Sequence, residues 1–433
     1  MARLLYGNFD VEHELATPHY NRPQRLARLN TELAPCLLAL ADSGDQIWCP
    51  EPLSEDPART LTDAGLRSAG FLSSCSEGEL PQELPVELAP WGWSRAAVAF
   101  ARQAGVEVPH VDLDAVRTAN SRGFSFALET SLEVAPRGTL RLESSRQLVD
   151  ALAESAAAWG RPAAEHRVVL KAEFGMSGRE RISLRGDEVL TPSMHGWINR
   201  RIEQSGVVYL EPWLHRVAEF STHWEILPPQ MPAGNRRETA QAVRPIAAVP
   251  VERDSESDEQ LRFVGQTQLL NTPHGQYVGS RVGAVATDIS GEDLNRLLAE
   301  IETIAEQVAA AVLRLGYAGP VGIDAMIYRD ADGCLKTRPV QDINARWSMG
   351  RVALALQQRL APAGCVSLLK IPAEHPHFST ASPGEFATGA KLLRLTPRAV
   401  GEISCTEAMV ALWAESPAEL LAAEQQLLAQ VSS

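Results

Sequence analysis

Several features are absent from this 433-residue sequence, and each absence excludes a class of protein. No apolar run approaches the ~18 residues that span a bilayer, and the N-terminus lacks the long apolar core of a signal peptide. We therefore expect a cytoplasmic protein with no membrane partner. The net charge of −14 disfavours non-specific nucleic-acid binding, so no nucleic-acid partner is expected.

The six cysteines are scattered, and the sequence has no C-x-x-C pair and no zinc-finger spacing of Cys and His. Reduced, mostly buried thiols are expected, and a catalytic cysteine is the minor alternative. The chain also lacks a G-x-x-x-x-G-K-[ST] loop, a G-x-G-x-x-G turn after a strand and a serine nucleophile elbow. A nucleotide must therefore be held in some other way.

The segment 321–346, VGIDAMIYRDADGCLKTRPVQDINAR, is the most informative part of what remains. It predicts two strands joined by a turn at residues 330–333. Because side chains alternate along a strand, Asp342 and Asn344 share one face, and the turn brings Asp324 back opposite them. Two carboxylates and an amide oxygen suit Mg²⁺ beside nucleotide phosphates. The alternative is a solvated hairpin with ordinary surface acids.

The rest of the chain alternates strands and helices, which favours the α/β class. In the first 118 residues we expect a strand near 46–50, a loop at 81–90, and a helix followed by a strand within 91–110. Short strands are expected at 167–171, 181–184 and 207–210, with a polar loop at about 228–260. Ser290 and Gly316 mark the ends of a long amphipathic helix, and another helix ends the chain.

The order of these features resembles the ATP-grasp superfamily, which includes D-alanine–D-alanine ligase, glutathione synthetase and biotin carboxylase. A strand ends at Lys171, the loop EFGMSG follows, a strand leads into Glu211, and Asp324 and Asp342-x-Asn344 come later. The resemblance covers about residues 119–355. It implies an N-terminal α/β pre-grasp domain (1–118), a small subdomain with a phosphate flap (119–210), a catalytic subdomain with the metal site (211–370) and a C-terminal extension (371–433).

The resemblance also implies a role for individual residues. The implied cofactor-binding residues are Arg122, Lys171, Ser177, Gly178, Glu211, Trp213, Leu214 and Glu219. Lys171 and Arg122 would hold the α- and β-phosphates, and residues 173–178 would close over them. The Glu211 carboxylate and the backbone after it would bind the adenine amino group, and Glu219 would bind the ribose hydroxyls. A solvated charge or a local ion pair is the alternative for each charged residue.

Catalytic roles are implied for Arg281 at the transferred γ-phosphate and for Arg346, which would bind either the carboxylate of the acyl acceptor or the acylphosphate. Arg351 is a weaker candidate that is more typical of a surface position. The implied metal ligands are Asp324, Asp342 and Asn344. The superfamily usually has Glu at the position of Asp342. Since Asp is one methylene shorter, a second Mg²⁺ is in question.

These features predict an ATP- and Mg²⁺- (or Mn²⁺-) dependent ligase that joins a small-molecule carboxylate to an amine through an acylphosphate, with release of ADP and phosphate. A small-molecule kinase or carboxylase-like enzyme is one alternative, and a nucleotide-binding regulatory protein is another. The sequence identifies neither substrate, and it leaves open whether the chain forms a homodimer.

Overall fold

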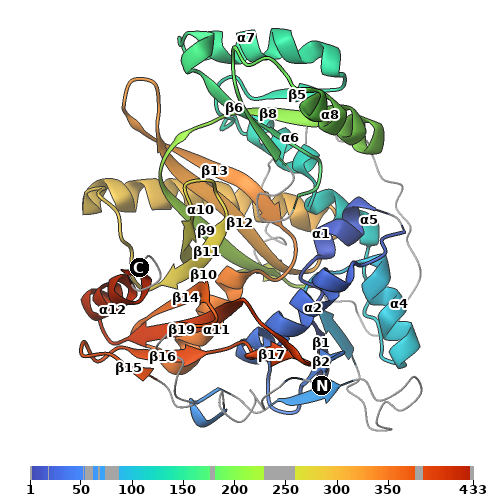
Figure 1. Cartoon of the computed structure of the whole chain (residues 1–433), viewed down its shortest axis with the longest axis vertical. Helices are drawn as coiled ribbons and strands as arrows, with labels where there is room; N and C mark the ends of the chain where they lie inside the picture. Colours follow the sequence, from blue (N-terminus) through green and yellow to red (C-terminus); the bar gives the residue numbers. More distant parts are fainter. Residues whose placement is uncertain are drawn as a thin grey trace.

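The structure is a computed structural model that describes residues 2–17, 19–51, 53, 62–66, 69–73, 87–175, 181–228, 259–375 and 384–429. Within these ranges a large sheet occupies the centre, a parallel N-terminal sheet lies beside it, and a small sheet lies at the top of Figure 1. The α/β class predicted from the sequence is confirmed. Residues 229–258 of the expected polar loop lie outside the described part.

The N-terminal unit is a parallel sheet with the described strand order β3-β2-β1-β4. Its strands are β1 (Arg3–Tyr6), β2 (Gln46–Cys49), β3 (Gly70–Ser73) and β4 (Glu87–Pro90). Its helices are α1 (Val11–Ala16), α2 (Gln24–Leu33), η1 (Ala34–Ala39), α4 (Arg95–Ala104) and α5 (Leu113–Ala119). Because parallel strands end at one edge of a sheet, the residues that follow β1 and β4 lie close together there.

The strand expected near 46–50 and the helix expected within 91–110 are present as β2 and α4. The loop expected at 81–90 is wrong at its end, since residues 87–90 form β4. This strand buries Leu88 beneath Ala97 and Ala101 of α4. Pro90, with no N–H, is tolerated because it is the last residue of the strand. The strand expected after α4 is reduced to a single bridge between Glu87 and Glu107.

The small sheet has the described strand order β5-β8-β6-β7, with all its neighbours antiparallel. Its strands are β5 (Leu140–Leu142), β6 (Arg167–Lys171), β7 (Arg181–Arg185) and β8 (Val208–Pro212). The helices around it are α6 (Arg122–Ser131), η2 (Ser145–Gln147), α7 (Leu148–Ala158), η3 (Ala163–Glu165) and α8 (Pro192–Ser205). Val168, Leu170 and Leu210 are buried with side chains of α7 and α8. Strand alternation therefore turns Lys171 and Glu211 to the opposite face.

The large sheet is antiparallel, with the described strand order β13-β12-β9-β10-β11-β14-β19-β16-β15. Its strands are β9 (His215–Ile226), β10 (Leu261–Asn271), β11 (Tyr277–Val282), β12 (Gly319–Arg329), β13 (Leu335–Asn344), β14 (Cys365–Pro372), β15 (Gly384–Glu385), β16 (Lys391–Arg394) and β19 (Glu407–Ala414). A short pair, β17 (Ala399–Val400) and β18 (Ile403–Ser404), lies apart from it. The boundary expected at 370/371 falls inside β14, which pairs along its whole length with β19.

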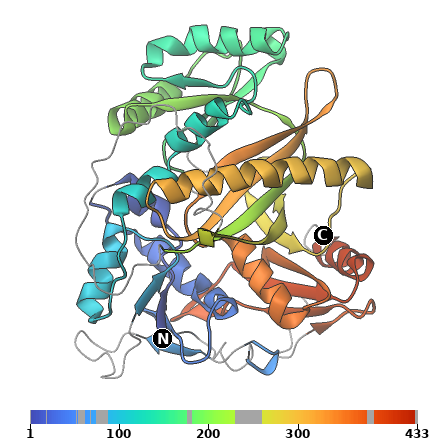
Figure 2. The same cartoon turned by 180° about the vertical axis from the view of Figure 1, so that it is seen from behind.

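The helices α10 (Gly291–Arg314), α11 (Met349–Leu360) and α12 (Pro417–Ala429) pack on this sheet. Figure 2 shows α10 lying across the sheet, where it packs on Phe220, Ala325 and Ile327. The predicted start of α10 is confirmed, because the Ser290 hydroxyl accepts a hydrogen bond from the Asp293 N–H at 3.2 Å. Gly316 follows its last turn with a φ of 89°, a conformation that favours glycine.

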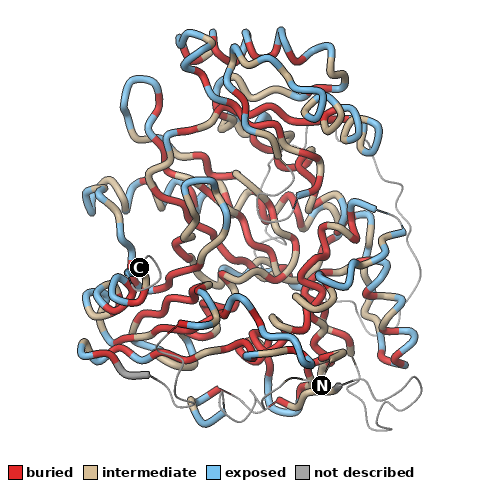
Figure 3. The backbone as a smooth tube through the Cα atoms, in the orientation of Figure 1, coloured by how far each residue is buried: buried red, intermediate tan, exposed pale blue. Residues whose placement is uncertain are grey.

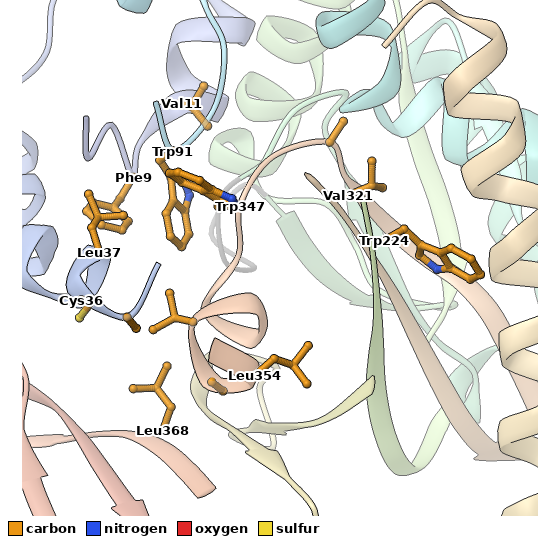
Figure 4. Close-up of a cluster of buried hydrophobic side chains, with 14 of the residues drawn as sticks. Phe9, Val11, Cys36, Leu37, Trp91, Trp224, Val321, Trp347, Leu354 and Leu368 are labelled. Atoms are coloured by element: carbon orange, nitrogen blue, oxygen red, sulfur yellow. The ribbon is translucent and has the colours of Figure 1, made fainter. Parts of the chain in front are cut away.

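The N-terminal unit packs on α11 and on the segment that follows β13. The backbone in the interior of the molecule is largely buried (Figure 3). The Trp347 N–H donates to the Trp91 carbonyl at 2.9 Å, and the Phe9 and Trp91 rings lie 4.5 Å apart (Figure 4). A Cβ at Gly92 would lie only 3.2 Å from Arg346 Cβ, so glycine permits this close approach. Residues at the edge of the N-terminal sheet thus meet the end of the predicted hairpin.

Within the described ranges, no helix is long and apolar enough to cross a bilayer. Cys36, Cys49, Cys365 and Cys405 are free and buried, whereas Cys334 is free and exposed. Cys75 lies outside the described residues.

Candidate functional site

A cleft of about 960 Å³ opens between the small sheet, the large sheet and the N-terminal unit. Ten of the residues predicted for the site line it: Arg122, Lys171, Glu211, Trp213, Leu214, Glu219, Asp324, Asp342, Asn344 and Arg346. Ser177 and Gly178 lie outside the described residues, and of the expected flap only Glu173 and Gly175 line the cleft. Residues far apart in the sequence therefore share one cavity of the size that holds small ligands.

The predicted hairpin is formed by β12 and β13, and its register places Asp324 directly opposite Asp342 and Gly322 opposite Asn344. Ile323 and Ile343 are buried on the other face of the hairpin. The Asn344 amide donates to Asp324 Oδ2 at 3.0 Å. Alternation along the paired strands therefore brings the two carboxylates and the amide to the cleft, as the sequence predicts.

The electrostatics of the hairpin favour a cation. Burial and the neighbouring Asp342 carboxylate raise the pKa of Asp324 to about 6. A divalent ion between the two acids would relieve this repulsion. The described residues include no group of three His, Cys, Asp or Glu that could hold a metal, so this site offers only two carboxylates and one amide. That set fits Mg²⁺, which keeps several waters and takes further oxygens from phosphate.

The amide of Asn344 is already engaged on both sides. Its Oδ1 accepts a hydrogen bond from Arg346 Nη2 at 2.8 Å, while its NH₂ faces Asp324. To present Oδ1 to a metal between the acids, the amide would have to turn. Asn344 therefore fits a metal site only after this local rearrangement.

A second charged region, which we term the cation centre, surrounds the Glu211 carboxylate. It comprises Arg122, Glu129, Lys171, Glu211 and Arg338. Lys171 Nζ lies 2.7 Å from Glu211 Oε2, and Arg338 Nη1 lies 2.6 Å from the same oxygen. Arg122 Nη1 lies 3.5 Å from Glu211 Oε1. Three cations thus surround two carboxylates, and one of them, Arg122, is shared with Asp342 of the hairpin. Clustered guanidinium and ammonium groups of this kind are suited to bind an anion such as a phosphate.

The pKa values in the cation centre follow from this crowding. Burial, and then the charge of Arg122, lower the pKa of Lys171 to about 8. Burial alone would raise the pKa of Glu211, but Arg338, Lys171 and Arg122 hold it well below its ordinary value. Glu211 is therefore ionised, and its Oε2 is engaged by both Lys171 and Arg338. The contact of its carboxylate with an adenine amino group stays a prediction, for which Oε1, 3.5 Å from Arg122, is the less engaged oxygen.

Sequence reasoning missed Arg338 and Glu129. Arg338 Nε and Nη2 donate to the two Glu129 oxygens at 2.6 and 2.9 Å, and both side chains are buried. One signal was available, because Arg122 and Glu129 are seven residues apart on α6 and therefore share a helix face. Arg338 lies on the second strand of the predicted hairpin, but no local pattern marked it as part of the site.

The segment that follows β8 forms the part of the cleft wall where the sequence predicts that the adenine base binds. The Trp213 ring lies beneath the guanidinium groups of Arg167 and Arg181, at 5.0 and 5.7 Å. Pro212 has no N–H, and the Trp213 N–H already donates to the Arg167 carbonyl at 2.8 Å. Neither residue can therefore recognise a base edge through its backbone N–H. Leu214 lies next along this wall.

Glu219, expected at the ribose, is buried at the same wall. Its Oε2 accepts hydrogen bonds from Asn271 at 2.7 Å and from Arg216 at 2.8 Å. Its Oε1 has one longer contact, with Gln341 Nε2 at 3.4 Å. Oε1 is therefore the less occupied acceptor for a hydroxyl.

The two predicted catalytic arginines are placed differently. Arg346 lines the cleft between Glu12 and Asn344. Arg281 does not reach the cleft: it is buried behind the sheet, where its Nε donates to Glu424 of α12 at 3.1 Å. The expectation that Arg281 meets a γ-phosphate is corrected for this reason. Arg351 pairs with Glu225 at 2.6 Å and is not among the residues that line the cleft.

Some residues that line the cleft carry buried polar atoms without a hydrogen-bond partner. They include Glu12 Oε2, Gln341 Oε1 and Arg346 Nε. Buried polar groups in folded proteins are nearly always paired, so such atoms call for an explanation. A ligand that supplies the missing donors and acceptors would provide one.

In sequence, no family model and no curated protein matches the chain. Many solved structures are similar in fold. Biotin carboxylase from Campylobacter jejuni has a TM-score of 0.53 at 13% identity, over 99% of this chain and 91% of that one. N5-carboxyaminoimidazole ribonucleotide synthetase from Thermus thermophilus has a TM-score of 0.53 at 14% identity, over 100% and 99%.

Pyruvate carboxylase from Rhizobium etli has a TM-score of 0.55 at 14% identity, over 99% of this chain but 37% of that longer one. This chain therefore spans little more than a third of that carboxylase. At such low identities the likeness shows a shared fold.

Proposed function

We propose that this chain, which has the ATP-grasp fold, is an ATP- and Mg²⁺-dependent ligase that joins a small-molecule carboxylate to an amine. The observation that carries the proposal is that the cation centre and the acidic hairpin meet in one cleft. Arg122 joins them, with its Nη2 3.2 Å from Asp342 Oδ2. A cationic site next to an oxygen-only site suits a nucleotide phosphate chain with its metal ion.

The residues that line the cleft would divide the work along the nucleotide. Lys171 and Arg122 would hold phosphate oxygens, and Trp213, Leu214 and Glu219 would bind the base and ribose. Asp324, Asp342 and Asn344 would hold Mg²⁺ or Mn²⁺, which when bound neutralises charge on the phosphates. A flap formed by residues 173–178, with Ser177 and Gly178, would exclude water.

In the proposed reaction, a carboxylate oxygen attacks the γ-phosphorus and ADP leaves. The amine then attacks the acyl carbon of the acylphosphate, and phosphate leaves with formation of an amide. Arg346 would bind the acyl group or its acceptor. Similar proteins support the nucleotide part of this scheme. N5-carboxyaminoimidazole synthetase from Staphylococcus aureus was solved with ADP, at a TM-score of 0.50.

Bicarbonate is a second candidate for the carboxylate. The biotin carboxylase domain of Hydrogenobacter thermophilus 2-oxoglutarate carboxylase was solved with MgADP and bicarbonate, at a TM-score of 0.52. With bicarbonate the same two steps would carboxylate the amine. The two candidates differ in the carboxylate that supports phosphate release.

The test is a screen for phosphate release over pooled carboxylates, including bicarbonate, and pooled amines. The substrate found is then labelled with ¹⁸O in its carboxylate. An acylphosphate route transfers one labelled oxygen to inorganic phosphate and yields ADP, whereas AMP as the sole nucleotide product would overturn the mechanism. The Lys171→Ala variant is the control and should lose turnover. Its ATP affinity should fall about tenfold or more, because a charge-assisted contact contributes roughly 1.5–3 kcal/mol.

A further inference from the structure

Part of the lining of the cleft comes from apolar residues outside the small sheet. We term it the acceptor lobe and define its apolar wall by Phe9, Leu29, Leu33, Trp91, Met349 and Met409. These residues come from the N-terminal unit, α11 and β19. The residues proposed for base, ribose and phosphate do not include them. The acceptor lobe is therefore an apolar space beside the proposed nucleotide site.

Each acidic side chain of the acceptor lobe is paired with a cation. Its cations are Arg346 and Lys370, and each already pairs with a glutamate, Glu12 and Glu407 respectively. A third acid, Glu32, pairs with Arg28, which is not among the lining residues. The three acids thus have three cationic partners, so a preference for a charged ligand depends on which carboxylate oxygens are left without a hydrogen bond.

Glu12 is the acid best placed to receive that charge. It lies in the first turn of α1, just beyond the edge of the parallel sheet, and is only 7% exposed. Its Oε1 accepts a hydrogen bond from Arg346, but its Oε2 has no partner. A buried carboxylate with one oxygen unpaired lacks a donor, and an ammonium group has three.

The contacts of Arg346 connect this acid to the proposed reaction centre. The same Nη2 atom that reaches Glu12 also donates to Asn344 Oδ1 at 2.8 Å. An amine at Glu12 would therefore be separated from the acidic hairpin by the Arg346 side chain alone. An amine acceptor must come this close to the acyl group that it attacks.

We infer that the acceptor lobe binds a primary amine with an aliphatic or aromatic body, and that the Glu12 carboxylate receives its ammonium group. This inference rests on the proposed ligase function and specifies the chemical class of its amine substrate. The apolar wall would contact the body of the ligand, and the unpaired Glu12 oxygen would accept a hydrogen bond from its ammonium group.

The experiment compares two ligands of nearly equal shape, phenethylamine and uncharged 2-phenylethanol. Calorimetry is carried out on the wild-type protein with saturating ADP and Mg²⁺. We expect phenethylamine to bind at least about tenfold more tightly, as a charge-assisted contact would give. In Glu12→Gln this preference should disappear, while Glu154→Gln, on the exposed face of α7, should keep it. The affinity for ADP and Mg²⁺ should stay within about twofold in Glu154→Gln, which shares no partner with the metal site.

The possible negative results distinguish failure of this inference from failure of the proposed ligase function. Wild-type protein that binds ADP and Mg²⁺ but shows no preference for the amine overturns the inference alone, as does a Glu12→Gln variant that keeps the preference. Wild-type protein that binds no nucleotide overturns the proposed function instead. If Glu12→Gln does not fold, Leu33→Arg places a cation in the same lobe. It should weaken phenethylamine about tenfold, and unchanged affinity would overturn the inference.

Discussion

The acidic hairpin and the cation centre face the same cleft but differ in assembly and in charge. The hairpin brings its acids together within one pair of adjacent strands, and it leaves Asp324 beside Asp342 with the pKa of Asp324 raised to about 6. The cation centre takes residues from α6, β6, β8 and β13, and it holds the pKa of Glu211 well below its usual value. The two acids of the hairpin thus repel each other and share one cation, Arg122, with the centre, whereas the carboxylates of the centre are held by several cations.

This difference separates a site that needs a ligand from a network that stabilises the fold. The ion pairs of the cation centre join the small sheet to the large sheet through Arg338 and Arg122. The acids of the hairpin are held by strand pairing, so their repulsion does not disrupt the fold. Substitutions in the centre should therefore affect stability most, and substitutions in the hairpin should affect metal-dependent binding most.

The largest effect is expected for Arg338→Met. This change leaves Glu129 and Glu211 buried without their shared cation, and breaking a buried ion pair from one side costs about 3–5 kcal/mol. Denaturant unfolding measures the loss of unfolding free energy. The matched control is Arg185→Met, because the exposed Arg185–Asp187 pair should contribute only about 0–1 kcal/mol. A loss for Arg338→Met no greater than that of the control would show that the centre does not stabilise the fold.

The next effect concerns the hairpin, in the Asp324→Asn, Asn344→Ala double variant. Loss of a single supporting contact at a metal site already costs about 10–100-fold in affinity, so removal of two ligands should cost on the order of a hundredfold or more. Titration of ATP with Mg²⁺ and with EDTA measures this. Wild-type binding should depend strongly on the metal, and binding by the variant should not.

A matched control lies in the turn of the same hairpin. Asp332 is exposed there, and Asp332→Asn should leave the metal dependence of ATP binding unchanged. Equal loss in the control and the double variant would mean that general charge, rather than a metal site, is responsible.

The contrast between the two regions also explains what could be predicted from the sequence. The hairpin, β6 and α10 were predicted because alternation, turn residues and caps act over a few neighbouring residues. The Arg338–Glu129 and Arg338–Glu211 pairs join positions 209 and 127 residues apart, and no local pattern reports such a meeting. In the same way, no local sequence pattern indicated that the strands after residue 370 extend the large sheet.

A smaller effect is expected when pH is changed. The affinity for Mg·ATP should fall at acid pH because of the hairpin and at alkaline pH because of the cation centre. The pKa of Asp324 is raised to about 6, so protons compete with the metal below that pH, and the affinity for Mg·ATP should fall about tenfold per pH unit. The pKa of Lys171 is lowered to about 8, so above that pH Lys171 loses the charge that would hold a phosphate, and affinity should fall again. Calorimetry from pH 5 to 9 should therefore show an optimum between the two values. Lys171→Met should remove only the alkaline limb; if that limb survives, another group titrates there.

The smallest effect on the cleft is expected for Arg281→Met, and it sharpens the comparison because this arginine is also buried in an ion pair. Its partners, Glu424 and Gln268, include no residue of the cation centre. Sites without shared partners usually couple by less than about 0.5 kcal/mol, so ATP affinity should change by no more than about twofold. The loss of unfolding free energy should still be several kcal/mol, since Glu424 is left buried without its cation. The Arg281→Met, Glu424→Gln double variant should recover part of that loss, because it removes the unpaired charge. The contrary outcome is a tenfold fall in the ATP affinity of Arg281→Met, together with recovery of the unfolding free energy in the double variant. That outcome would show that Arg281 acts on the nucleotide although it is buried behind the sheet.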